Sequence, residues 1–221
     1  MSQMSQTIVE NPRRTKTIRE LGSVDISSIK DDIVNLSQEY WDKYNRLKPN
    51  YFGEFETTQH IVFKFVSDYH QPFPDLVEFP VWEEWKDKLE PVMKAATELY
   101  GYSESAYGKV MLAKLKRGGK IGLHVDRPIE SAYPHKIHIP ITTNPDTKFL
   151  LDDQSYHLEV GKAYEVNNRT LHGGVNEGDS DRIHLIFAYY DRTMNEIKAD
   201  DPELFAAQLR DQIKAAGMYK Y

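Results

Sequence analysis

The sequence predicts a mainly β protein with flanking helices, and three patterns along the chain support this fold class. Apolar residues in the N-terminal third recur three and four positions apart, which is the spacing of one helix face. Between about residues 108 and 191 the chain changes to short β-branched and aromatic runs separated by turn residues. After residue 200 the helical spacing returns. The expected order is therefore helices, a β-rich middle and a helical tail.

Composition limits the classes of protein that the chain can belong to. The 221 residues are 40% hydrophobic and 28% charged, which is ordinary for a globular protein, and one domain over residues 21–221 is expected. No run approaches the roughly 18 apolar residues that span a bilayer. The absence of cysteine excludes disulfides and thiolate metal sites and favours the cytoplasm. A net charge of -6 argues against a nucleic-acid partner.

The first twenty residues carry no apolar block of signal-peptide length. They are expected to form a flexible arm, and their basic cluster is interpreted as a solvated face. This cluster consists of Arg13, Arg14, Lys16 and Arg19.

Helices and a strand are expected before the β-rich middle. One helix is predicted from Asp25 or Ser27, either of which could cap it, to a point before Pro49. The run "TQHIVFKFVS" is typical of a strand. The segment "VWEEWKDKLEPVMKAATELYGY" has helical spacing, with Trp82 and Trp85 on its core face and a kink or a new first turn at Pro91.

The tail also predicts a helix, over about residues 201–216. Asp201 is a capping residue and Pro202 fits the first helical position. The apolar face of this helix could cover the sheet or a second subunit, so the oligomeric state is left open.

Seven short strands are predicted in the middle of the chain, and their number suggests a sandwich or a barrel. The runs are "KVMLAKL", "IGLHVD", "HKIHIPITT", "KFLLDD", "SYHLEV", "AYEVNN" and "RIHLIFAYYD". Alternation along two of them places Lys136 and His138 on one face, and Arg182 with His184 on one face. Polar groups should therefore converge inside, while the apolar face is covered by helices.

The pattern "HVD" places His124 and Asp126 on the same side of an extended chain, which is suitable for binding a metal if a third ligand exists. His172, which follows a predicted strand and precedes a glycine-rich turn, could supply that ligand. Two histidines and one carboxylate form the facial triad of non-haem Fe(II) oxygenases, which leaves three coordination positions open. A 2-oxo acid can occupy two of these positions and dioxygen the third.

Arg182 lies ten residues after His172 inside an apolar strand, where a buried guanidinium needs an anionic partner. Its planar fork suits the remote carboxylate of a dicarboxylate cosubstrate. His135 and His157 are expected at the surface or at strand edges, and His184 fits either a role behind the site or a hydrogen-bonded place in the core.

Two stretches that contain these residues resemble a known family. The stretches "KRGGKIGLHVDRPIESAYPHKIHIPI" and "GKAYEVNNRTLHGGVNEGDSDR" resemble the aspartyl/asparaginyl β-hydroxylase family of Fe(II)/2-oxoglutarate-dependent oxygenases. The resemblance implies a double-stranded β-helix, a cupin-like jelly roll over about residues 105–192, covered by the N-terminal and C-terminal helices. It implies that His124, Asp126 and His172 bind Fe(II), and that Arg182, His138 and Lys136 bind 2-oxoglutarate. Lys136 departs from the arginine that is common in the family.

The resemblance further implies a hydroxylase that consumes dioxygen and 2-oxoglutarate and acts on a peptidyl Asp or Asn β-carbon. A free amino acid such as proline is the alternative substrate, and Arg127 could meet a substrate carboxylate. A metal-binding cupin without oxygenase activity is the alternative from another class. If the protein is an oxygenase, the expected substrate is an amino acid, a peptide or a protein. No nucleic-acid or membrane partner is expected.

Overall fold

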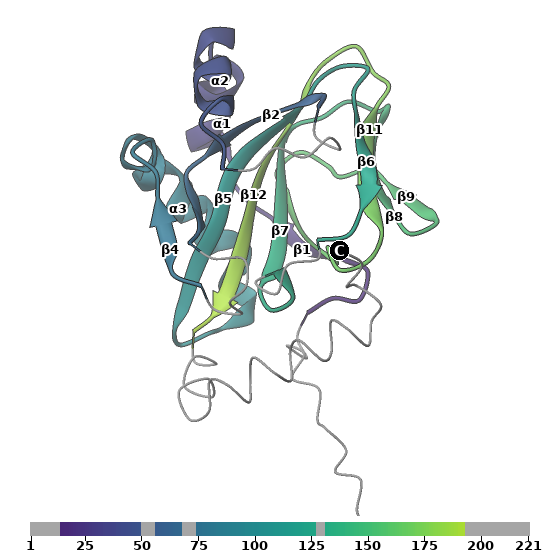
Figure 1. Cartoon of the computed structure of the whole chain (residues 1–221). Helices are drawn as coiled ribbons and strands as arrows, with labels where there is room; N and C mark the ends of the chain where they lie inside the picture. Colours follow the sequence, from purple (N-terminus) through teal and green to yellow (C-terminus); the bar gives the residue numbers. More distant parts are fainter. Residues whose placement is uncertain (1–13, 50–55, 68–73, 127–130, 193–221) are drawn as a thin grey trace, which may run out of the picture.

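The computed structural model describes residues 14–49, 56–67, 74–126 and 131–192, which form a mainly β protein with helices along one side (Figure 1). Two antiparallel sheets contain ten of the twelve strands of the described residues. The larger sheet has the strand order β1-β10-β7-β12-β5-β2, the smaller has β6-β11-β8-β9, and β3 and β4 form a separate pair. Among the described residues, no helix is long and apolar enough to cross a membrane.

The elements of the first half are β1 (Ile18–Ser23), α1 (Ser27–Val34), α2 (Gln38–Asn45), β2 (Thr58–Val62), β3 (Lys64–Val66), β4 (Leu76–Glu78), α3 (Trp82–Thr97) and the short 3-10 helix η2 (Glu98–Tyr100). The second half is all strand: β5 (Ser105–Leu115), β6 (Lys120–His124), β7 (His135–Thr142), β8 (Thr147–Leu151), β9 (Gln154–Tyr156), β10 (Lys162–Val166), β11 (His172–Asn176) and β12 (Arg182–Asp191). The predicted tail helix lies outside the described residues.

Side-chain alternation along β7 and β12 agrees with the sequence prediction. Ile137, Ile139, Leu185 and Phe187 are fully buried in a core that they share with α1 and α3. The opposite faces of these strands turn toward the smaller sheet, which lies across from the larger one in Figure 1. A second apolar cluster joins the two sheets through Phe149 and Leu151 of β8 and through Tyr164 and Val166 of β10. Polar side chains of β7 and β12 are thus enclosed between the sheets.

The single helix predicted near the N-terminus is wrong in one respect, because two helices form. Ser37 interrupts the helix, and its side chain accepts a hydrogen bond from the Tyr40 N–H (3.2 Å), which caps α2. At α1 the capping prediction also changes: Ile26 occupies the cap position, while Asp25 accepts a hydrogen bond from the Ser27 N–H. The break allows α1 to bury Ile29 while α2 buries Trp41.

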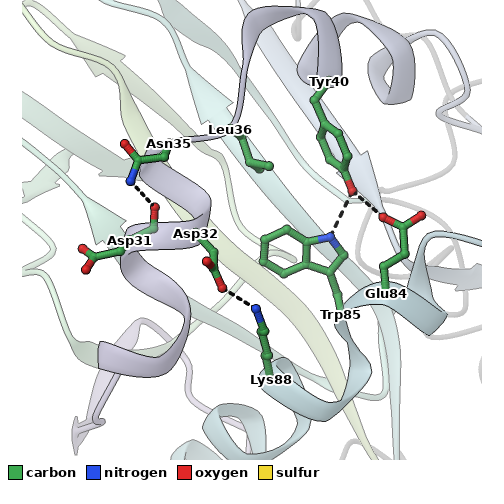
Figure 2. Close-up of a pocket in the computed structure, with 8 residues that line it drawn as sticks. All are labelled: Asp31, Asp32, Asn35, Leu36, Tyr40, Glu84, Trp85 and Lys88. Atoms are coloured by element: carbon green, nitrogen blue, oxygen red, sulfur yellow. Dashed lines mark hydrogen bonds and ion pairs between the residues drawn. The ribbon is translucent and has the colours of Figure 1, made fainter.

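Helix α3 runs through Pro91 without ending there, and it buries Trp82 and Trp85 as the sequence predicts. The Trp85 indole N–H donates to the Tyr40 hydroxyl at 3.0 Å, which fastens α3 to α2 (Figure 2). These helices also line a cavity of about 410 Å³ whose walls are Asp31, Asp32, Asn35, Leu36, Tyr40, Glu84, Trp85 and Lys88. Because the helices cover the outer face of the larger sheet, this cavity is separate from the predicted metal site.

The expected flexible arm over residues 1–20 is wrong for its last part. Strand β1 starts at Ile18 and pairs with β10, so Arg19 lies within a sheet, whereas Lys16 is exposed as predicted. Arg19 pairs with Glu165 at 2.5 Å. Residues 1–13, which include Arg13, lie outside the described residues.

His135 is also placed differently from the prediction, because it is fully buried. Its Nδ1–H donates to Glu165 at 2.6 Å, and its Nε2 lies 2.6 Å from the Tyr102 hydroxyl, from which the neutral imidazole can accept a hydrogen bond. Burial lowers the pKa of His135, although Glu165 opposes this shift. Burial would raise the pKa of Glu165, yet the His135 N–H, the Thr15 N–H and Arg19 together hold it below its usual value. His157 is exposed, as predicted.

Replacing Glu165 with leucine should lower the free energy of unfolding by about 3 kcal/mol. The change leaves the His135 N–H and the Tyr100 hydroxyl, which also donates to Glu165 at 3.0 Å, without their buried acceptor. Glu159, which is exposed and pairs with Lys162 at 2.9 Å, is the matched control, and its replacement by leucine should cost less than about 1 kcal/mol. Urea unfolding at pH 7 measures the free energy of unfolding of both variants. An equal loss in Glu165→Leu and Glu159→Leu would contradict a buried network around Glu165.

Candidate metal centre and cosubstrate pocket

His124 and His172 face each other across two neighbouring strands. They are register partners in the antiparallel pair of β6 and β11, and their ring centroids lie 4.3 Å apart. Asp126 follows β6 on the same side. One ligand atom from each of these three residues lies within 4.8 Å of the other two. The fold therefore brings together the three side chains that the sequence predicts as metal ligands.

Hydrogen bonds fix which ring nitrogen each histidine offers. The Nδ1 of His124 is 2.8 Å from the Gly122 carbonyl, and the Nδ1 of His172 is 3.0 Å from the Thr170 carbonyl. Since a carbonyl only accepts, each Nδ1 must carry a proton, and in the neutral imidazole Nε2 then keeps its lone pair. Burial lowers the pKa of His172, which preserves this neutral form. Both rings are therefore prepared to bind a cation through Nε2.

Asp126 is held as a carboxylate by several neighbours. Burial would raise its pKa, but Lys136, His172 and Lys109, with a hydrogen bond from the Asn168 amide, lower it below the usual range. The Asn168 Nδ2 donates to Asp126 Oδ2 at 2.9 Å, while Asp126 Oδ1 lies 3.7 Å from the His124 Nε2. One carboxylate oxygen is thus occupied by the protein and the other faces the histidine.

Gly173 and Gly174 belong to strand β11, where the sequence predicts a glycine-rich turn. A Cβ atom at Gly173 would lie 2.7 Å from the Ile121 carbonyl oxygen, so only glycine permits this approach of β6 and β11. The two glycines therefore allow close strand packing beside His172, and the predicted turn at this position is wrong.

Arg182 is a buried cation at the start of β12. It is 3% exposed, its Nε has no hydrogen-bond partner, and no carboxylate of the described segments pairs with it. Burial lowers its pKa to about 10. Two positions along the same strand face, His184 is 1% exposed and its Nε2 is also unpartnered. Buried polar groups are normally satisfied, so this end of the pocket fits an anionic ligand with several oxygens.

His138 and Lys136 lie on the strand next to β12. The Nδ1 of His138 is 3.4 Å from the Nδ1 of His184, and its ring packs edge-on against Phe149. Burial lowers the pKa of His138 well below its ordinary value. Lys136 is half-buried and pairs in register with Ala188 of β12 and Val166 of β10. Arg127 lies outside the described residues.

His60 is a residue of this pocket that the sequence analysis missed. It lies on β2 opposite Ala113 of β5, which is in turn opposite His184 of β12. Burial, together with the charges of Lys48, Arg182 and Lys136, lowers the pKa of His60 to about 3. Only the pairing of β2 with the larger sheet reveals this neighbourhood, because no sequence pattern links His60 to the later motifs.

Comparison with known proteins identifies the family. The family model described as aspartyl/asparaginyl beta-hydroxylase matches residues 79–192, just over half of the chain. The chain belongs to the aspartyl/asparaginyl β-hydroxylase family. No curated relative matches the sequence. As a member of this family the chain is an Fe(II)- and 2-oxoglutarate-dependent oxygenase, which confirms the class predicted from the sequence.

One solved structure shares the fold at low sequence identity, and two others are similar at lower TM-scores. A prolyl hydroxylase from Trichoplax adhaerens, in complex with a hypoxia inducible factor peptide fragment, is 10% identical over 83% of this chain and 87% of that chain, with a TM-score of 0.53. A 2OG-Fe(II) oxygenase from Burkholderia pseudomallei is 14% identical over 61% of this chain and 66% of that chain, with a TM-score of 0.47. A viral collagen prolyl hydroxylase from Paramecium bursaria Chlorella virus-1 is 11% identical over 79% and 96%, with a TM-score of 0.46.

Proposed function

We propose that this family member hydroxylates the β-carbon of an Asp or Asn residue in a peptide, with Fe(II) held by His124, Asp126 and His172. The observation that carries the proposal is the convergence of these three ligand atoms within 4.8 Å in a protein whose facing sheet holds the buried Arg182. The two facing sheets support the double-stranded β-helix that the family resemblance implies. A cytoplasmic location, predicted from the absence of cysteine, is part of the same proposal.

When bound, Fe(II) with 2-oxoglutarate and dioxygen supplies the oxidation that converts a C–H bond to C–OH, with release of succinate and carbon dioxide. The residues of this chain bind and orient the reactants. In the proposed arrangement Arg182 binds the distal carboxylate of 2-oxoglutarate through its planar fork. His138 and Lys136 line the path between Arg182 and the triad. The apolar cluster around Phe149 and Tyr164 keeps water away from this path.

Positive charge around Asp126 supports a substrate that carries a carboxylate. Lys109 and Lys136 both act on the Asp126 carboxyl, and Arg169 donates to the Asp126 backbone carbonyl at 2.5 Å. Lys109 has a φ of 48°, in the left-handed region, at a bulge where β5 gains a residue over β12. A non-glycine residue in this conformation costs about 1 kcal/mol, and such strain is concentrated at functional sites.

A pair of peptides that differ only by Asp or Asn at the target position tests the role of Lys109. We expect the wild type to prefer the Asp peptide in kcat/KM, and Lys109→Met to reduce this preference about tenfold, because the charge is lost while the side-chain length is kept. Lys109→Arg should retain the preference. Lys116→Met, at an exposed position, is the control. An unchanged preference in Lys109→Met would argue against an acidic substrate group at this position.

The alternative substrate is a free amino acid such as proline, and the two are separated by a mass-spectrometric screen. The purified protein with Fe(II), 2-oxoglutarate and oxygen is offered peptides and free amino acids, and both succinate release and the gain of one oxygen are measured. Hydroxylation of an Asp or Asn residue supports the proposal, while hydroxylation of free amino acids alone contradicts it. A cupin that only binds metal would give neither product, nor the visible charge-transfer band expected on anaerobic addition of Fe(II) and 2-oxoglutarate.

A further inference from the structure

The segment of residues 14–17 runs beside the segment of residues 165–169, which precedes His172. The Asn167 N–H donates to the Thr17 carbonyl at 2.7 Å, and the Asn167 side-chain amide donates to the Lys16 carbonyl at 2.8 Å. The Thr15 N–H donates to a carboxylate oxygen of Glu165 at 3.1 Å. These contacts hold the start of the described chain against a segment that is far away in sequence.

Asn168, in the middle of this segment, connects the N-terminal residues to the proposed metal ligand Asp126. The Arg14 Nη2 donates to Asn168 Oδ1 at 2.6 Å, and the Asn168 Nδ2 donates to Asp126 Oδ2 at 2.9 Å. The backbone contributes as well, because the Asp126 N–H donates to the Asn168 carbonyl at 2.9 Å. Asn168 is 3% exposed, so its amide is enclosed between a guanidinium and a carboxylate.

Each group in this series determines the orientation of the next. An asparagine amide has one accepting end and one donating end, and Arg14 at the accepting oxygen directs the NH2 group toward Asp126. The positive charge also polarises the amide and strengthens the bond that it donates. With its Oδ2 held in this way, Asp126 presents its Oδ1 toward His124. Arg14 further donates to the Ala132 carbonyl at 2.6 Å.

We propose that Arg14 is a positioning residue of the iron site, which acts through Asn168 to hold Asp126 in the orientation that binds the metal. This inference rests on the proposed function, in which Asp126 is a ligand. Arg14 precedes the segment matched by the family model, residues 79–192, so the contact extends the site to a part of the chain that the family match does not include.

The experiment compares two arginines of the same N-terminal segment, with Fe(II) alone as the probe. The dissociation constant of Fe(II) is measured anaerobically by competition with a chromogenic chelator, and thermal unfolding of the apo protein is measured in parallel. Partners behind metal ligands typically contribute 10–100-fold to affinity. We therefore expect Arg14→Met to raise the dissociation constant at least about tenfold, and Arg14→Lys to recover part of the loss.

Arg19→Met is the matched control because Arg19 pairs with Glu165 rather than with Asn168. It should lower the unfolding temperature and leave the Fe(II) dissociation constant within about twofold of the wild type. Asn168→Ala should weaken Fe(II) binding as well, and adding Arg14→Met to it should cause little further loss, since the two residues act in series.

Two results would overturn the inference: an unchanged dissociation constant in Arg14→Met, or an equal rise in Arg14→Met and Arg19→Met. The second result would mean that the N-terminal segment stabilises the fold only. Asp126→Ala separates these outcomes from a failure of the proposed function. If Asp126→Ala weakens Fe(II) binding strongly while Arg14→Met has no effect, the ligand assignment stands and only the role of Arg14 is lost.

Discussion

Replacement of His172 by alanine is expected to raise the Fe(II) dissociation constant at least about a hundredfold and to leave the apo protein folded. His172 is one of three proposed ligands whose atoms lie within 4.8 Å of one another, and its Nδ1 bond to Thr170 leaves Nε2 available to bind the metal. Loss of one ligand leaves two, and the chain offers no further histidine or carboxylate in the same cluster of described residues. The effect should therefore exceed the 10–100-fold that is typical of residues behind the ligands.

Thermal unfolding with and without metal measures this effect. A metal that binds only the folded state stabilises it by about 2.7 kcal/mol when present at a hundred times its dissociation constant. Mn(II), which avoids oxidation during heating, should raise the unfolding temperature of the wild type and have little effect on His172→Ala. His157→Ala is the control, because His157 is exposed and bonds only the Thr147 carbonyl among the described residues. Equal metal stabilisation of His172→Ala and the wild type would contradict the site.

The sequence was sufficient to predict the site residues that depend on local pattern. The His124–Asp126 pair follows from strand alternation, and the burial of Arg182 follows from the apolar residues around it. The outer faces of β7 and β12 were predicted for the same reason, since a period of two is visible in a single strand. In each of these cases the information lies within a few neighbouring residues.

What the sequence did not predict depends on contacts between distant segments. Arg14 meets Asn168, and Arg19 meets Glu165, only because β1 pairs with β10 at an edge of the larger sheet. His135 was not expected to be buried, because the residues around it in the sequence do not include Glu165. In the fold, the Glu165 carboxylate accepts a hydrogen bond from the His135 ring. A basic cluster before the first strand has the composition of a solvated arm, and composition does not show which carboxylates the fold will bring to it.

Arg182→Met is expected to raise the stability of the apo protein and to lower its affinity for 2-oxoglutarate. In the apo protein Arg182 is a buried cation with no carboxylate partner among the described residues, and burial lowers its pKa to about 10. Methionine fills a similar volume without a charge to desolvate, so the apo variant should be more stable than the wild type by about 1–3 kcal/mol. An arginine that is structural would give the reverse result, because its replacement would break an ion pair and lower the stability.

The same change should remove most of the affinity for 2-oxoglutarate. Loss of one partner of a buried charge pair costs about 2–5 kcal/mol in binding, which corresponds to a rise in the dissociation constant of roughly thirtyfold or more. Fe(II) binding should change little, because Arg182 is not one of the three ligands. The 2-oxoglutarate dissociation constant of Arg182→Lys should lie between those of the wild type and Arg182→Met, since lysine keeps the charge but lacks the planar fork. Arg117→Met, at an exposed position, is the control for a lost surface charge.

Anaerobic titration of the Fe(II) protein with 2-oxoglutarate, followed by the visible charge-transfer band, measures the cosubstrate affinity separately from turnover. If Arg182→Met loses Fe(II) and 2-oxoglutarate binding to the same extent, Arg182 supports the fold of the whole site rather than the cosubstrate. If instead the apo variant gains stability and loses only its affinity for 2-oxoglutarate, the buried Arg182 cation reduces the stability of the apo wild type. Its anionic partner is then the cosubstrate. That combination is expected, because the buried guanidinium has no other anion to pair with in the described residues.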